Sequence, residues 1–117
     1  MRIAIAIIIA ALGLHTGGNV LAAEMPVLAK EQGCDACHDI DKSLVGPAWM
    51  AISTKYKGVA RYAYGGREYS LEDGLVMKVS RGGGGNWGAT PMPPNDPKGL
   101  KQAEMRTLVR FVLDLAK

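Results

Sequence analysis

Cys34-Asp35-Ala36-Cys37-His38 is the stretch that decides how the rest of this 117-residue sequence is interpreted. Its pattern, C-x-x-C-H, is the one through which c-type haem is attached to a polypeptide. Two thiols at this spacing reach two vinyl groups on one edge of a porphyrin, and the histidine that follows brings its imidazole under the iron. The chain has two cysteines and, beyond residue 23, a single histidine. The stretch therefore predicts one covalent haem c, attached through Cys34 and Cys37, with His38 as an axial ligand of the iron.

Three other kinds of site use a closely spaced cysteine pair, and each lacks part of its pattern here. A structural zinc ion needs four cysteine or histidine ligands, and no second pair is present. A thioredoxin-like redox pair needs a strand–helix–strand context, which the sequence does not indicate. A structural disulfide would close a very short loop and leave His38 unexplained. Haem attachment is therefore the leading interpretation.

Residues 1–23 have the pattern of a secretory signal peptide. Arg2 supplies a positive start, Ile3 to Leu14 is an apolar run, and Leu21-Ala22-Ala23 offers a cleavage site before residue 24. The apolar run is shorter than the ~20 residues that a membrane-spanning helix needs. We therefore expect export to the periplasm without a stable membrane anchor; the alternative is an uncleaved anchor.

The expected mature domain, 24–117, has 94 residues and is small for a self-sufficient hydrophobic core. A covalent haem would add the missing apolar mass. This domain carries 13 Lys and Arg against 11 Asp and Glu, with no basic run. The charge pattern thus gives no indication of a nucleic-acid partner, and nothing in the sequence demands more than a monomer.

The periodicity of apolar residues and the helix-capping residues predict several short helices. We expect helices from Pro26 towards Gly33, and over 49–56, 70–81 and 102–116, with a loop over 39–48. We expect Gly33 to permit close helix–helix contact rather than simply to end the first helix. The tyrosine-rich segment 59–69 is the least readable part: it suits either a helix and a turn or a loop that covers one haem edge.

Met92 is the strongest candidate for the second axial ligand of the iron. No second histidine is available, and the expected mature chain has five methionines. Met50, Met77 and Met105 fall in expected helices, where methionine usually fills a core. Met92 instead lies between Pro91 and Pro93, which stiffen the backbone in an extended form. His38 and Met92 are therefore the predicted metal ligands.

Two protein ligands on the iron indicate an electron carrier rather than an enzyme. A thioether ligand favours the ferrous state and raises the reduction potential. The alternative is a haem enzyme or gas-binding protein with a labile sixth ligand. A third reading, a membrane-anchored or complex-bound cytochrome subunit, depends on whether residues 1–23 are retained.

Pro47 and Trp87 have two possible roles each, and Lys78 is a further candidate for contact with the haem. The Pro47 carbonyl is either the acceptor that orients the His38 ring or part of an ordinary turn. Trp87 either donates its indole N–H to a haem propionate or packs in the core. Lys78 is a candidate partner for a propionate, although spacing alone does not place it there.

The same residues resemble those of a known family. Gly33 to His38, then Val45-Gly46-Pro47-Ala48, then Trp87-Gly88 leading to Pro91-Met92-Pro93-Pro94-Asn95, are similar to segments of the small class I cytochromes c of Gram-negative bacteria. This resemblance implies an all-α fold of four to five short helices wrapped around one covalent haem, in which the first and last helices cross. It implies periplasmic electron transfer between redox proteins, such as a cytochrome bc-type donor and a nitrite reductase, peroxidase or oxidase acceptor.

The resemblance also implies roles for residues around the iron ligands. Pro47 would accept a hydrogen bond from His38, Asn95 would orient the Met92 thioether by a hydrogen bond, and Trp87 would contact a propionate. Three features depart from the family pattern. Segment 59–69 is longer than usual, Lys78 replaces a frequent arginine, and the last helix lacks a Ser or Asp cap near Lys101.

Overall fold

The structure is a computed structural model that describes residues 13 and 22–117. The segment predicted to be a signal peptide, 1–23, lies outside the described residues except for 13, 22 and 23. Within the described part of the chain, no helix is both long and apolar enough to cross a membrane.

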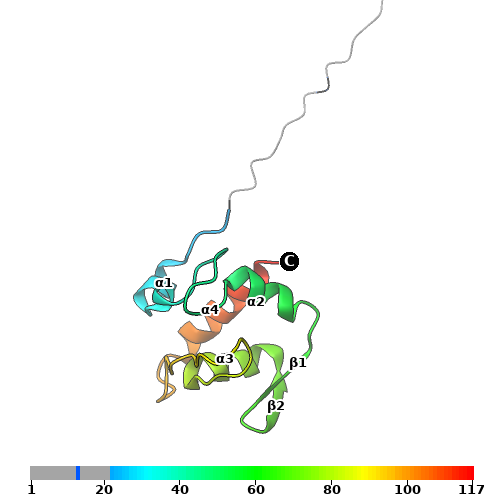
Figure 1. Cartoon of the computed structure of the whole chain (residues 1–117). Helices are drawn as coiled ribbons and strands as arrows, with labels where there is room; N and C mark the ends of the chain where they lie inside the picture. The colour runs from blue at the N-terminus through cyan, green and yellow to red at the C-terminus, as the bar shows by residue number, and fades with distance from the viewer. Residues whose placement is uncertain (1–12, 14–21) are drawn as a thin grey trace, which may run out of the picture.

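The described residues form four α-helices, one short 3-10 helix and one two-stranded sheet (Figure 1). In chain order these elements are α1 (Val27–Glu31), the 3-10 helix η1 (Cys34–Ala36), α2 (Trp49–Tyr56), β1 (Arg61–Tyr64), β2 (Arg67–Ser70), α3 (Leu71–Arg81) and α4 (Gln102–Asp114). The mostly helical fold confirms the predicted class, with a β-hairpin added to it.

The two middle helices begin and end as their sequences predict. The bounds of α2 coincide with the predicted helix 49–56. α3 begins after Ser70, whose side-chain oxygen accepts a hydrogen bond from the backbone N–H of Asp73 at 3.3 Å. It ends at Gly82, which has a φ of 75° that a residue with a side chain rarely adopts. The predicted cap and the predicted glycine stop are therefore both confirmed.

The first helix is shorter than expected, and the prediction for Gly33 was wrong. α1 ends at Glu31, and Gly33 follows with a φ of 74°. A Cβ atom built at Gly33 would have no neighbour within 4 Å, so this glycine does not serve close packing. Its left-handed conformation instead turns the chain from α1 into η1.

Segment 59–69 is neither a helix with a turn nor a loop that covers the haem edge, which corrects the earlier expectation. It belongs to an antiparallel hairpin in which Tyr62 pairs with Tyr69 and Tyr64 with Arg67. Gly65 and Gly66 make the two-residue turn, with φ angles of 58° and 77°. Two successive positive φ angles suit the right-handed twist of a hairpin, which is why a Gly-Gly pair joins these strands.

α4 is the helix on which the core is built. It packs against α1, α2 and α3 (Figure 1), which confirms the predicted contact between the last and first helices. Its buried residues are Met105, Leu108, Val109 and Val112. Met105 is fully buried, as expected of a methionine that fills a core.

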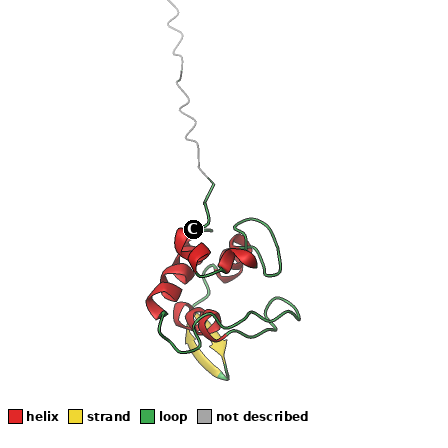
Figure 2. Cartoon of the chain, turned by 90° about the vertical axis from the view of Figure 1, so that its left-hand side faces the viewer, coloured by secondary structure: helices red, strands yellow, loops and turns green. Residues whose placement is uncertain are grey.

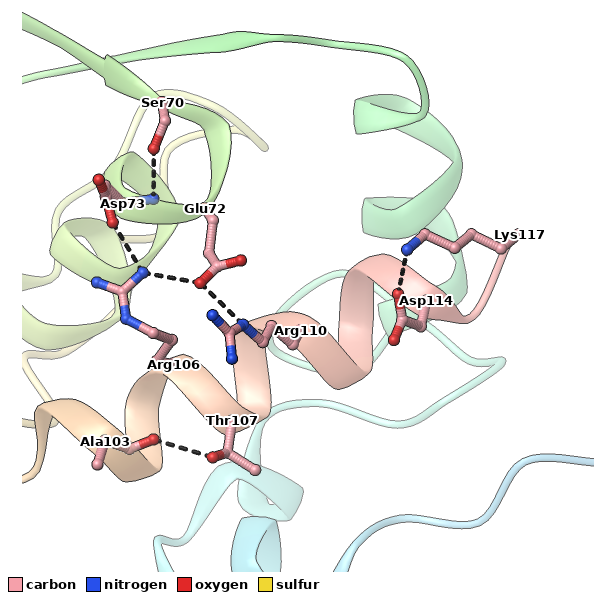
Figure 3. A network of polar contacts seen from close by, with 9 residues as sticks. All are labelled: Ser70, Glu72, Asp73, Ala103, Arg106, Thr107, Arg110, Asp114 and Lys117. Carbon is pink, nitrogen blue, oxygen red and sulfur yellow. Dashed lines mark hydrogen bonds and ion pairs between the residues drawn. The ribbon is translucent and has the colours of Figure 1, made fainter.

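Polar contacts also join the start of α3 to α4 (Figure 3). Arg106 Nη1 lies 2.8 Å from Glu72 Oε1 and 2.7 Å from Asp73 Oδ1, and Arg110 Nε lies 2.9 Å from Glu72 Oε1. Hydrogen bonds from Arg110 and Arg106 lower the pKa of Glu72. These groups are largely exposed, so we expect them to align the two helices rather than to add much stability.

The N-terminal end of α4 is held by Asp96, which lies well before the helix in sequence. Its carboxylate accepts hydrogen bonds from the backbone N–H groups of Leu100 and Lys101, at 2.8 and 3.0 Å, and from Gln102 Nε2 at 2.7 Å. Burial raises the pKa of Asp96, but these hydrogen bonds outweigh it and hold the pKa below its usual value. Asp96 thus closes the turn that leads into α4, whereas the cap position Lys101 makes no side-chain hydrogen bond to the helix, as its sequence predicts.

We expect Asp96→Asn to lower the unfolding temperature of the holoprotein at neutral pH and to have less effect in acid. A carboxyl whose folded-state pKa is depressed stabilises the fold above its unfolded pKa, and this contribution disappears as the pH falls through the folded pKa. The difference between the proteins should therefore shrink as the pH falls below about 5. Thermal unfolding followed by circular dichroism measures it. The control Asp114→Asn removes an exposed ion pair with Lys117 and should change little; equal effects of both variants would contradict the capping role.

Candidate haem site

Two long loops reach out to the same side of the helices (Figure 2). Between residues 34–47 and residues 83–93 lies a cavity of about 280 Å³. One side of it is lined by Cys34, Cys37, His38 and Pro47, and the opposite loop contributes Trp87 and Met92. Apolar residues of the helices line the remainder, among them Ile52, Leu75, Val79, Leu108, Val109 and Val112. Of the eight residues that the sequence singled out, seven therefore share one cavity, because Lys78 lines it as well and only Asn95 does not.

The two cysteines are free and partly buried. Burial, helped by the charge of Asp35, raises the pKa of the Cys34 thiol, so this thiol is protonated at neutral pH. Among the described residues no group of three or more His, Cys, Asp and Glu side chains is arranged to hold a metal ion. The described residues thus give no support to the zinc and disulfide alternatives.

His38 is held in one orientation. Its side chain is buried, and Nδ1 lies 2.8 Å from the carbonyl oxygen of Pro47. A carbonyl oxygen can only accept, so Nδ1 carries the proton and Nε2 is the nitrogen with a free lone pair. A ring fixed in this way presents Nε2 to a metal without a reorientation step.

Gly46 shapes the same site, although the sequence marked it only as a turn residue. A Cβ atom at Gly46 would lie 2.5 Å from Cε1 of His38, closer than any real contact. The backbone N–H of Gly46 also donates to the carbonyl of Cys37 at 2.8 Å. The loop therefore passes so close to the imidazole that only glycine fits.

Met92 is placed by its backbone. Its N–H donates to the Gly83 carbonyl and its carbonyl accepts from the Gly83 N–H, both at 2.9 Å. Gly83 and Met92 thereby form an isolated antiparallel bridge. This bridge and the flanking prolines hold the methionine at the cavity wall that faces His38.

Asn95 does not line the cavity. Its side-chain amide donates to the carbonyls of Val79 and Pro93, both at 3.1 Å. These two bonds anchor the end of the methionine loop to α3. The hydrogen bond from Asn95 that would orient the Met92 thioether stays a prediction.

Trp87 and Lys78 both lie at the cavity wall. Trp87 is 43% exposed, which excludes the core-packing alternative, and Lys55 Nζ lies 4.5 Å from its ring centroid. Lys78 Nζ donates to the carbonyl of Gly83, and burial lowers the pKa of this lysine. Both residues carry N–H donors and line the cavity.

This donor set fits a haem. Two thiols, a buried imidazole and a methionine line one largely apolar cavity, and such a set could attach a porphyrin twice and supply two ligands to its iron. The sequence model of the cytochrome c family matches residues 22–116. The chain belongs to the cytochrome c family.

Individual cytochromes c show the same likeness. Cytochrome c-551 of Azotobacter vinelandii is 43% identical over 86 residues, which cover 74% of this chain and 90% of that one. Cytochrome c-551 of Pseudomonas aeruginosa is 38% identical over 109 residues, covering 89% and 93%. The crystal structure of Nitrosomonas europaea cytochrome c552 superposes with a TM-score of 0.62 at 33% identity, covering 75% of this chain and 95% of that one.

The family assignment establishes the general function. The chain is a c-type cytochrome of the small class I kind that transfers electrons and carries covalent haem c with its iron. This confirms the predicted resemblance, fold, cofactor and electron-transfer function. Its partners are accordingly other redox proteins.

Several residues near the site were missed by the sequence analysis. Tyr62 and Tyr56 line the cavity, and Tyr64 lies on the same strand of the hairpin as Tyr62 without lining it. A signal was present: Tyr62, Tyr64 and Tyr69 surround a Gly-Gly pair, which is a strong short-range indication of a hairpin. Lys55, whose Nζ donates to the Asn86 carbonyl at 3.1 Å, gave no such signal.

Proposed function

We propose that this cytochrome is a periplasmic carrier that moves one electron at a time on a haem ligated by His38 and Met92. The observation that carries the proposal is the shared cavity of residues 34–38 and 92, which lie far apart in the sequence. A haem iron with protein ligands on both sides changes its coordination little with oxidation state. Fast electron exchange requires this property, whereas turnover of a substrate at the iron requires an open position.

The residues of the cavity would divide the work of holding the haem. The thiols of Cys34 and Cys37 would each add across one vinyl group, with the sulfur bonding to carbon and the thiol hydrogen going to the other vinyl carbon. His38, oriented by Pro47, would ligate the iron from one side and Met92 from the other. Trp87 would donate to a propionate at the rim, and Asn95 would support the loop that carries Met92.

The remaining parts of the proposal concern where the protein works and with what. Residues 1–23 would be removed as a signal peptide, and residues 24–117 would form a monomeric periplasmic domain without a membrane anchor. The chemistry of an electron carrier requires a donor and an acceptor. A cytochrome bc-type complex and a nitrite reductase, peroxidase or oxidase are the partners that we propose.

A potentiometric titration of the exported holoprotein tests this function. The sample is first defined by its intact mass, which should equal residues 24–117 plus one haem. The visible spectrum should then follow a single one-electron transition, with a slope of about 59 mV per decade. The iron should stay low-spin at both ends, and the ferrous protein should not bind carbon monoxide. A high-spin iron that binds carbon monoxide or turns over peroxide would favour the enzyme or gas-binding alternative.

A further inference from the structure

The hairpin β1–β2 is docked on α3 through one buried tyrosine. Tyr62 is 7% exposed, and Gly74 of α3 lies directly against it. A Cβ atom at Gly74 would lie 2.6 Å from Cβ of Tyr62, so only glycine lets α3 pass this close to the Tyr62 side chain. This close packing gives the hairpin a fixed position relative to the cavity.

Two tyrosine hydroxyls of the hairpin reach the glycine segment 82–86, which follows α3. Tyr64 Oη donates to the Gly82 carbonyl at 2.8 Å, and Tyr62 Oη accepts from Asn86 Nδ2 at 2.5 Å. The contacts thus lie at the two ends of the segment. Burial raises the pKa of Tyr62 to about 12, so its hydroxyl is neutral at physiological pH.

The glycine segment has little stiffness of its own. Gly82, Gly83 and Gly85 have φ angles of 75°, 118° and 94°. A run of glycines has many backbone conformations of similar energy, so its position is set by whatever holds it from outside. In this structure the side-chain contacts that hold it come from Tyr62 and Tyr64 of the hairpin, and from Lys55 and Lys78.

The glycine segment in turn positions the iron-facing methionine. Gly83, next to the carbonyl held by Tyr64, exchanges both backbone hydrogen bonds of the bridge with Met92. A displacement of Gly83 therefore displaces Met92. The path from the tyrosine hydroxyl to the methionine consists of two hydrogen-bonded steps.

We propose that Tyr64 and Tyr62 are positioning residues that hold the Met92 thioether at the iron through the glycine segment. The hairpin is thus a clamp on the methionine loop. This inference rests on the proposed ligand role of Met92. It assigns a task to the tyrosine-rich segment that differs from the cover over one haem edge that its sequence suggested.

Tyr64→Phe is the cleanest test, because Tyr64 does not line the cavity and the variant changes no wall that faces the haem. Its matched control is Tyr69→Phe, which removes a hydroxyl from the other strand of the same hairpin. Tyr69 makes no side-chain hydrogen bond to the glycine segment within the described residues. Imidazole is titrated into each ferric holoprotein, and displacement of the methionine is followed by the loss of its weak red charge-transfer band.

The clamp predicts that imidazole binds the Tyr64→Phe protein about two- to tenfold more tightly than wild type, since the net effect of one hydrogen bond is of this size. Tyr69→Phe should leave the affinity unchanged. Tyr62→Phe should act in the same direction as Tyr64→Phe. The unfolding temperature is measured alongside, because a merely structural tyrosine would lower it without changing the affinity for imidazole.

Two results would overturn the clamp, and they are distinguishable. Equal imidazole affinities in wild type, Tyr64→Phe and Tyr62→Phe, with the methionine band present in all three, would show that Met92 binds iron without help from the hairpin. A wild-type holoprotein that lacks the band would remove the ligand role of Met92 itself, and the clamp with it.

Discussion

Met92→Ala is expected to lower the reduction potential by on the order of 100 mV, within the about 0.8 V range that axial ligands span. A neutral, soft thioether favours ferrous over ferric iron, so its loss favours the oxidised state. The substitution leaves the backbone bridge to Gly83 intact, because that bridge uses only main-chain atoms. The variant should therefore keep its loop and lose only the sulfur.

The matched control for this prediction is Met50→Ala. Met50 lies on α2 and is not among the residues that line the haem cavity. Met50→Ala removes the same kind of side chain from a partly buried position, and the reduction potential of this variant should stay near that of wild type. The ferric Met92→Ala protein should also bind added cyanide readily. An unchanged potential in Met92→Ala would contradict the assignment of this residue.

His38→Ala should have the second large effect: the exported protein should lose its low-spin spectrum and accumulate in much lower yield. The imidazole is buried and its Nδ1 is held by Pro47, and residues 24–117 contain no second histidine that could replace it. Orienting contacts of this kind are worth about 10- to 100-fold in metal affinity, and loss of the ligand itself costs more. Yield and spectrum of periplasmic extracts measure the outcome.

Added ligands separate the role of the ring from a general folding defect. Imidazole should restore a low-spin spectrum in His38→Ala, because its N–H can donate to the Pro47 carbonyl while its other nitrogen binds iron. N-methylimidazole lacks this N–H and should restore the spectrum less well. A normal low-spin spectrum in His38→Ala without any added ligand would show that another group occupies the position.

The two ends of the site could be predicted because each is a contiguous pattern with its own chemistry. Cys34 to His38 places three haem-binding groups within five residues, and the prolines around Met92 exclude a helix. α2 and α3 could be predicted because an apolar stripe coincides with a clear stop or cap, as at Ser70 and Gly82. Local signals of this kind do not depend on the tertiary structure.

The parts that were missed depend on contacts between distant segments. The strands of the hairpin have four residues each, too few for a period-two pattern to stand out. Asp96 caps a turn that precedes α4 by closing back on Leu100 and Lys101, which no cap position in the sequence marks. The side-chain amide of Asn95 donates a hydrogen bond to the Val79 carbonyl, which only the folded chain brings near.

The glycines show the same division between local and tertiary information. The sequence identifies Gly46 as a turn former, but only the structure shows a backbone so close to the His38 ring that a Cβ atom would clash. The reverse holds for Gly33, which has open space around it and a positive φ. A glycine beside a motif thus predicts a special backbone position without telling whether conformation or space requires it.

The visible spectrum of the oxidised, exported protein tests the central claim most directly. If His38 and Met92 close the iron, the ferric protein is low-spin and shows the weak red charge-transfer band of methionine sulfur on haem. The same band should be absent from Met92→Ala and present in Met50→Ala. A high-spin ferric spectrum without this band in the wild-type protein would mean that one coordination position of the iron is vacant. It would contradict the proposal that this chain is an electron carrier whose iron has two protein ligands.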